Sequence, residues 1–125
     1  MDKIVVDSNV LIRYLLKDET VTYHLENLIN KNFSIYVPAI VFAEMMSYPK
    51  LTESERMTIK SFVNNFYFIP IDFSIAELGG FLRSKYKIKL PDALISATSI
   101  YLDAELFTFN LRDFKKIKEL RLYKF

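Results

Sequence analysis

Four acidic residues, far apart along the chain, stand where the sequence predicts that strands meet helices. They are Asp7 in KIVVDSNVLI, Glu44 in VPAIVFAEMM, Asp92 in LPDALISAT and Asp113 in FTFNLRDF. Carboxylates are costly to bury and repel one another when they are gathered. A fold that brings these groups together is therefore expected to use them to hold a divalent cation.

Two of these acids also have an ordinary structural explanation. Asp7 could cap the helix that follows it, and Ser8 or Asn9 could serve equally well. Asp92 follows Pro91 at a predicted helix start, where the helix dipole favours an anion. Capping and metal binding are compatible for Asp7, because one carboxylate oxygen can do each.

The other two acids also have both a structural and a functional interpretation. Glu44 has the most apolar surroundings of any acid in the chain, which fits either the rim of the core or a carboxylate pointed into a site. Thr108, Asn110 and Asp113 form T-x-N-x-x-D after a predicted strand, where such residues commonly make turns and caps.

Strands and helices are predicted to alternate, which indicates an α/β domain with a mostly parallel sheet. The strands are expected at Ile4–Val6, Phe33–Val37, Phe66–Ile71 and Glu105–Phe109, with a possible last one at Leu120–Tyr123. The helices are expected after the Asp7–Asn9 cap, over Val21–Asn30, after Pro38 in a first turn, over 52–64, from a Ser74 cap to Tyr86, from Pro91 to Asp103, and over Leu111–Glu119. Parallel sheets place their sites beyond the carboxyl ends of the strands, so topology alone can bring Asp7, Glu44 and Asp113 to one edge. Periodicity does not show that Asp92 joins them.

Composition limits the classes of protein to consider. We expect residues 1–125 to form one domain, and two glycines and four prolines argue against a disordered tail. No apolar run approaches the roughly 20 residues of a membrane span, and the N-terminus lacks a signal-peptide pattern, so we expect a cytoplasmic protein with no membrane partner. The absence of cysteine excludes disulfides and thiolate metal sites.

The formal net charge is only +2, but the basic residues are unevenly distributed. One group is Arg83, Lys85, Lys87 and Lys89, and the other is Arg112, Lys115, Lys116, Lys118, Arg121 and Lys124. Both could be solvated faces, or they could contact the phosphates of a nucleic acid. Tyr48, Tyr86 and Phe114 are candidates for stacking on bases. The lone His24 is expected to be a surface or packing residue.

Taken together, V-V-D-S-N-V-L, the isolated Glu44, L-P-D-A-L-I-S-A-T and F-T-F-N-L-R-D-F resemble the PIN-domain ribonucleases, above all the VapC-type toxins of toxin–antitoxin pairs. The resemblance runs from Asp7 to Phe114 in the family's order. One departure is Phe109, where a polar or basic residue is common. The resemblance implies a three-layer α/β/α sandwich around a mostly parallel sheet of about five strands.

The resemblance further implies a Mg²⁺- or Mn²⁺-dependent endoribonuclease that hydrolyses RNA phosphodiester bonds. Its catalytic residues would be Asp7, Glu44, Asp92 and Asp113. Asp7, Asp92 and Asp113 would ligate the metal, and Glu44 would orient or deprotonate the attacking water or help to hold a second ion. The residues expected to hydrogen-bond the carboxylates or the substrate are Ser8, Thr108 and Asn110. An all-oxygen ligand set suits these hard cations.

As partners, the resemblance implies an RNA substrate, a cognate antitoxin protein and a possible homodimer. The alternatives are a catalytically inert PIN-fold binding module and a metal-dependent nuclease outside any toxin–antitoxin pair. A receiver-like signalling domain would need an acidic pair after the first strand, where this chain has Asp7 alone.

Overall fold

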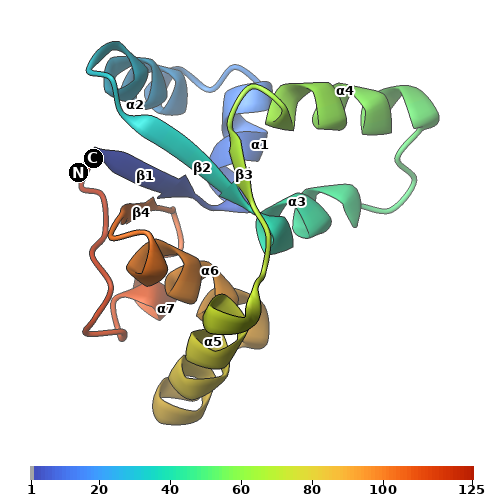
Figure 1. The fold of residues 1–125 in the computed structure, drawn as a ribbon. Coiled ribbons are helices and arrows are strands. Elements are labelled where there is room, and N and C mark those ends of the chain that lie inside the picture. Colours follow the sequence, from blue (N-terminus) through green and yellow to red (C-terminus); the bar gives the residue numbers. More distant parts are fainter. Residues whose placement is uncertain (1) are drawn as a thin grey trace.

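A computed structural model describes residues 2–125, and four strands form its one parallel sheet. The strands are β1 (Lys3–Val6), β2 (Ser34–Pro38), β3 (Tyr67–Ile69) and β4 (Glu105–Phe107), and their order is β3-β2-β1-β4. Helices cover both faces: α2 and α4 lie above the sheet in Figure 1, and α5 and α6 lie below it. The predicted α/β sandwich is therefore confirmed.

Seven helices connect and flank these strands. They are α1 (Ser8–Leu15), α2 (Glu19–Asn30), α3 (Ala39–Met46), α4 (Glu53–Val63), α5 (Phe73–Tyr86), α6 (Leu90–Tyr101) and the short α7 (Leu111–Phe114). Side-chain caps start several of them, including Asp18 on α2 and the Thr52–Glu55 capping box on α4. Within residues 2–125, none of these helices is long and apolar enough to cross a membrane.

The central strand β1 is apolar because both of its faces are covered. Ile4, Val5 and Val6 are fully buried, as expected for a strand inside a parallel sheet with helices on each side. Ile4 pairs with Ile35 of β2 on one side and with Glu105 of β4 on the other. The first short β-branched run of the sequence thus forms the middle of the domain.

The order of the strands decides where a site can form. The chain moves outward from β1 to β2 and β3, and then returns through α5 and α6 to place β4 on the other side of β1. The order in which strands are added reverses between β1 and β4. Parallel sheets bind ligands at the carboxyl edge of such a topological switch point. Asp7 directly follows β1, and Thr108 directly follows β4.

The C-terminal part contains less regular structure than the sequence predicted. The last strand is reduced to one parallel bridge between Leu106 and Leu122, and β4 ends at Phe107 rather than at Phe109. The helix expected to run to Glu119 ends at Phe114. Short apolar runs do not reveal which of their residues continue to pair, because pairing depends on a neighbouring strand.

Two predicted helix starts were also wrong. Asp72, not Ser74, caps α5, because its carboxylate accepts a hydrogen bond from the Ile75 backbone N–H at 2.9 Å. Pro38 closes β2 and occupies the N-cap of α3 instead of its first turn. In each case the observed helix start differs from the predicted one by only one or two positions. Helix ends are hard to predict to the residue, because neighbouring residues can also serve as the cap.

Two neighbouring glycines of α5 offer a matched test of the packing of α5 on α6. A Cβ on Gly79 would lie 2.7 Å from Leu94 Cδ2 of α6, whereas a Cβ on Gly80 meets nothing within 4 Å. Gly80→Ala is expected to raise the free energy of unfolding by about 0.5–1 kcal/mol, since glycine weakens a helix interior. Gly79→Ala should gain less or lose, because Leu94 must leave its rotamer. Urea unfolding of both variants measures this, and an equal gain for the two would contradict the close packing.

Candidate active site

Asp7 is buried at the junction of β1 and α1, with only 5% of its surface exposed. It is the N-cap of α1, and its Oδ1 accepts a hydrogen bond from the Ser8 backbone N–H at 2.7 Å. Its own N–H donates to the Phe107 carbonyl at 3.0 Å, which continues the pairing of β1 with β4. The capping and the site interpretations of Asp7 therefore describe the same carboxylate.

The turn after β4 supplies the second oxygen of Asp7 with a donor. The Thr108 hydroxyl, fully buried, donates to Asp7 Oδ2 at 2.8 Å and accepts from the Asn110 backbone N–H at 3.0 Å. Asn9 closes the same junction, because its Oδ1 accepts from the Phe109 N–H at 3.2 Å. These bonds tie two segments that are about a hundred residues apart in sequence.

Asn9 is a residue whose importance the sequence did not reveal. In the sequence it was only a candidate cap for α1, but in the structure it also points its Nδ2 toward Asp7 Oδ2 at 3.4 Å. Its hydrogen bond with Phe109 joins the first turn of α1 to the turn after β4, and no local sequence pattern indicates such a contact. The nearest sequence signal is its place two positions after Asp7.

Glu44 reaches the site from α3 and contains an unusual buried atom. Its Oε1 has no hydrogen-bond partner in the described part of the chain, although buried carboxylate oxygens are normally paired. Burial raises the pKa of Glu44, and the charges of Asp7 and Asp92 raise it further, while the Ser8 hydroxyl opposes them. Glu44 thus contributes a desolvated oxygen, and its pKa responds to the charges of Asp7 and Asp92.

Asp92 and Asp113 complete the group from the other side. Asp92 lies in the first turn of α6, and Asp113 lies in α7, where its Oδ2 accepts a hydrogen bond from Asn110 Nδ2 at 3.0 Å. Burial raises the pKa of Asp92, and the charges of Asp7 and Asp113 add to this, while Lys89 opposes them. Asp92 therefore lies close enough to both acids to sense their charge.

The electrostatic couplings link all four predicted acids. Asp7 acts on Glu44 and on Asp92, and Asp92 acts on Glu44 and is acted on by Asp113. The pKa of Asp7 is itself raised, because its burial outweighs the hydrogen bonds from Thr108 and Ser8. Repelling, partly desolvated carboxylates of this kind are characteristic of sites that act on a ligand.

The donor set suits a hard divalent cation, although the carboxylates are not closed around one. Within residues 2–125, no three Asp, Glu or His side chains lie close enough to chelate an ion as they stand. Mg²⁺ commonly keeps several waters and takes only one or two protein carboxylates directly, so it does not need a tight cage. The unpartnered Oε1 of Glu44 and the oxygen-only chemistry of Asp7 and Asp92 fit such an ion.

The other predicted residues are placed as follows. Ser8 and Thr108 contact Asp7, and Asn110 contacts Asp113, so all three hydrogen-bond within the acidic group. Phe114, expected as a base-stacking candidate, is fully buried in the core and cannot stack on a base. Tyr48 remains exposed.

His24 is held within an aromatic cluster. Its Nδ1 lies 3.0 Å from the Tyr123 hydroxyl, and its ring packs edge-on against Phe107, Tyr123 and Phe125. It is a packing residue, as the sequence suggested.

The fold and the site together define a parallel α/β domain with an acidic group at the switch point of its sheet. Residues 4–120 match the PIN domain family. The chain belongs to the PIN domain family, as its motifs predicted.

Relatives of known structure or activity agree with this assignment. The chain is 28% identical over 121 residues to Ribonuclease VapC19 of Mycobacterium tuberculosis, and the match covers 93% of this chain and 95% of the relative. The fold is similar to VapBC2 from Rickettsia felis bound to a DNA fragment from their promoter, with a TM-score of 0.84, 26% identity and 98% of both chains covered. It is also similar to a toxin–antitoxin complex from Klebsiella pneumoniae, with a TM-score of 0.79, 29% identity, and 98% of this chain and 99% of that chain covered.

Removal of one charge from the acidic group is expected to stabilise the metal-free protein. Asp92→Asn should raise the unfolding temperature in EDTA at neutral pH by a few degrees, because the folded chain no longer bears that repulsion. Between the ordinary pKa and the raised pKa of Asp92, the folded state holds the extra proton, so wild-type stability falls as pH rises. The advantage of the variant should therefore grow with pH across this window and shrink toward the ordinary pKa, below which Asp92 is protonated in both states.

Thermal unfolding of both proteins from about pH 4 to about pH 7.5 measures this difference. Asp103→Asn is the control, since Asp103 is exposed and pairs with Arg121 at 2.8 Å, outside the acidic group. Equal unfolding temperatures of wild type and Asp92→Asn at neutral pH would show that the carboxylates do not repel.

Proposed function

We propose that this chain is a VapC-type endoribonuclease that hydrolyses RNA phosphodiester bonds with the help of Mg²⁺ or Mn²⁺, and that it is the toxin of a toxin–antitoxin pair. The proposal is supported mainly by the four coupled carboxylates at the carboxyl edge of the sheet. The similarity to Ribonuclease VapC19 supports RNA as the substrate, and the similarity to the Rickettsia felis and Klebsiella pneumoniae complexes supports an antitoxin partner. We take residues 1–125 to act as one nuclease domain.

In this mechanism, Asp7, Asp92 and Asp113 would hold the ion. The bound ion would supply positive charge that polarises the phosphate and increases the acidity of a water. Glu44 would accept a proton from the attacking water or orient it through its unpartnered Oε1, and its raised pKa makes it a stronger base once it is ionised. Thr108 would keep Asp7 in position, and Asn110 would do the same for Asp113.

Loss of a proposed ligand should abolish cleavage without unfolding the domain. Asp92→Asn is expected to lower the rate of RNA cleavage by more than about 100-fold, the upper end of the cost typical for groups that only orient a ligand. Thr108→Val should cost about 10–100-fold, because Asp7 Oδ2 then loses its buried donor. The assay is cleavage of a mixed-sequence RNA with Mn²⁺ or Mg²⁺, with EDTA as the negative control.

The matched control is Asp103→Asn, which should cleave as the wild type does. Wild-type rates in Asp92→Asn would remove Asp92 from the mechanism, and the lack of any cleavage by the wild-type protein would refute the nuclease assignment. Calorimetric titration with Mn²⁺ separates an inert module from an enzyme, since an inert module would not bind the ion.

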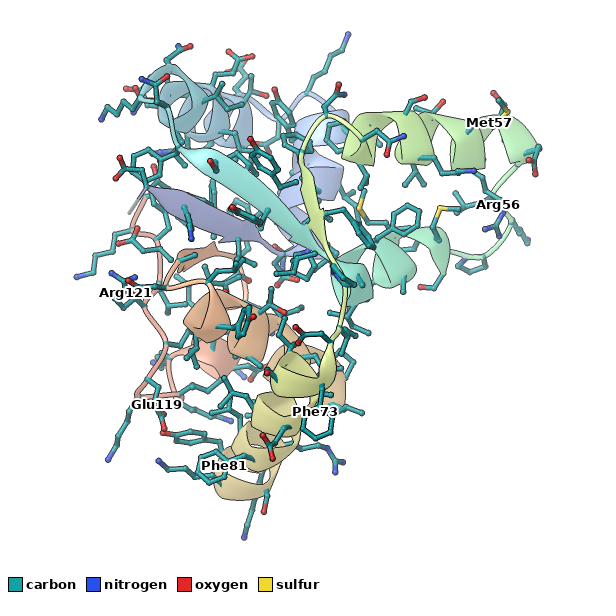
Figure 2. All side chains as sticks on the ribbon, in the orientation of Figure 1. Arg56, Met57, Phe73, Phe81, Glu119 and Arg121 are labelled. Carbon is teal, nitrogen blue, oxygen red and sulfur yellow. The ribbon has the colours of Figure 1, made fainter. Side chains whose placement is uncertain are left out.

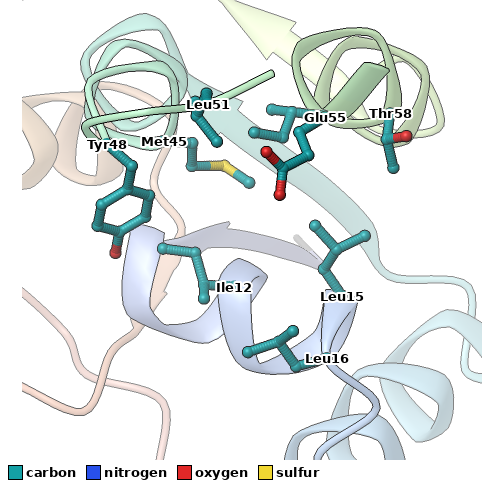
Figure 3. Close-up of a pocket in the computed structure, with 9 residues that line it drawn as sticks. Ile12, Leu15, Leu16, Met45, Tyr48, Leu51, Glu55 and Thr58 are labelled. Carbon is teal, nitrogen blue, oxygen red and sulfur yellow. The ribbon is translucent and has the colours of Figure 1, made fainter. Parts of the chain in front are cut away.

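An apolar groove between α1, α3 and α4 is the surface that we assign to the antitoxin. Figure 3 shows Ile12 and Leu15 of α1, and Leu16 directly after it, facing Met45 and Leu51. These residues line a cavity of about 210 Å³. Leu16 is 75% exposed, which is unusual for a leucine in an apolar groove. The Glu55 carboxylate, whose Oε1 also accepts a hydrogen bond from the Thr52 backbone N–H at 2.9 Å, points into the groove in Figure 3 and would favour a partner segment with apolar residues and a basic side chain.

A charge placed in this groove should prevent inhibition but not cleavage. Leu16→Asp is expected to weaken the affinity for the antitoxin encoded by a neighbouring gene by at least tenfold, about 1.4 kcal/mol. The readout is growth after induction of each variant with and without that gene, together with the cleavage rate. Ile29→Asp, an exposed apolar residue of α2 outside the groove, is the control and should remain inhibited. Full inhibition of Leu16→Asp would place the antitoxin elsewhere.

The expected homodimer would use a different apolar surface. Phe73 and Phe81 of α5 are 83% and 56% exposed, and both are labelled on α5 in Figure 2. Large exposed aromatics on one helix are typical of an interaction surface.

A further inference from the structure

A small polar cavity adjoins the acidic group. Its volume is about 160 Å³, and it is lined by Lys87, Ile88, Lys89, Asp92, Asp113 and Lys116. The lining comes from the loop between α5 and α6, from the start of α6, from α7 and from the turn after α7. The cavity therefore shares two carboxylates with the proposed cleavage site.

The lysines of this cavity lack ionic partners. In the described chain, Lys85 pairs with Glu119 at 3.1 Å and Arg121 pairs with Asp103, but neither Lys87, Lys89 nor Lys116 has an acidic oxygen within 4.0 Å. The lining of the cavity thus contains three lysines and only two acids. The surplus positive charge is open to an anionic ligand, which would also offset the charge of the acids.

The backbone holds these lysines in place. Lys87 ends α5 in the left-handed conformation, with φ 55° and ψ 40°, a position that glycine usually occupies because a Cβ is unfavourable there. Its N–H donates to the Arg83 carbonyl at 2.8 Å. Ile88, buried to 8% exposure, anchors the segment between Lys87 and Lys89. The two lysines therefore flank a fixed point instead of lying on a free loop.

The start of α6 adds to the positive potential. No side chain caps this helix at Lys89, and the helix dipole places partial positive charge at its start, which Asp92 in the first turn offsets in part. α6 has twelve residues, long enough for this effect. The dipole and the lysines favour the same kind of ligand.

We propose that this lysine-lined cavity binds a phosphodiester group of the RNA strand, next to the phosphate that is cleaved. The inference rests on the proposed ribonuclease function. RNA carries a charge at every nucleotide, so one strand can place one phosphate at the carboxylates and a neighbouring phosphate between Lys87 and Lys116. Because Asp92 and Asp113 line both places, the ligand of the cavity must be the polymer that reaches the cleavage site. The lysines thereby position the strand and take no part in the chemistry.

The test measures RNA binding in EDTA, which prevents metal-dependent cleavage. The probe is a fluorescent single-stranded RNA of about 12 nucleotides, within the span of typical single-strand sites. The variants are Lys87→Gln, Lys116→Gln and the double variant. Lys89 is left intact because its charge acts on Asp92.

Each lost contact should reduce the slope of log affinity against log salt by about 0.7, with a several-fold loss of affinity at low salt. In cleavage assays the double variant should raise KM and keep kcat. Lys87→Arg should bind as the wild type does.

The matched control is Lys50→Gln. Lys50 is also exposed and its backbone is also in the left-handed region, with φ 64°, but it does not line the cavity. An equal loss in Lys50→Gln would mean that only general surface charge matters, and would overturn the proposal. Unchanged binding in the double variant, while the wild type cleaves RNA, would overturn it and leave the ribonuclease function intact.

Binding that depends on the lysines, in a protein that cleaves no RNA with Mn²⁺ or Mg²⁺, would support the cavity and refute the ribonuclease function. A glutamate-rich peptide that needs Lys87 and Lys116, when RNA does not, would assign the cavity to an acidic protein and overturn the proposal.

Discussion

The burial of the Asp7 carboxylate between two strand ends is the constraint on which the rest of the site depends. A buried carboxylate is costly unless its oxygens are hydrogen-bonded. Here the Ser8 N–H satisfies one oxygen and the Thr108 hydroxyl satisfies the other. Because one donor comes from α1 and the other from the turn after β4, the two ends of the chain must meet for Asp7 to be tolerated. This requirement fixes the edge at which Glu44 and Asp92 then gather.

The turn after β4 is held from its outer side by an aromatic cluster that the family pattern does not suggest. Phe109 lies under the Arg13 guanidinium at 4.0 Å and packs edge-on against Phe125 at 5.0 Å. Such cation–π and aromatic contacts are individually modest but directional. They clamp the residue between Thr108 and Asn110, both of which hydrogen-bond within the acidic group. The unusual phenylalanine thus acts as a support for the site.

Repulsion among the carboxylates at this edge of the sheet destabilises the domain, and packing in the core offsets that loss of stability. The buried Ile4, Val5 and Val6 of β1, together with the close packing of α5 on α6 at Gly79, provide the stability that a group of repelling carboxylates removes. Small buried residues of α6, such as Ala93 and Ala97, allow that helix to approach the sheet closely, which brings Asp92 to the strand ends. Strain concentrated at a site and balanced by the core is a general feature of proteins that act on ligands.

The sequence by itself indicated the α/β class, because β-branched runs and helix caps depend on local chemistry. Its ordered motifs identified the family by resemblance and singled out the four acids as candidate site residues. Tertiary structure decided the limits of the C-terminal elements. In place of the predicted last strand, for example, the chain forms one bridge between Leu106 and Leu122. Tertiary structure also decided the bond between Asn9 and Phe109, and the lysine-lined cavity beside Asp92. Those features join segments up to a hundred residues apart, and a local pattern carries no information about which distant partner will satisfy a donor or leave a charge unpaired.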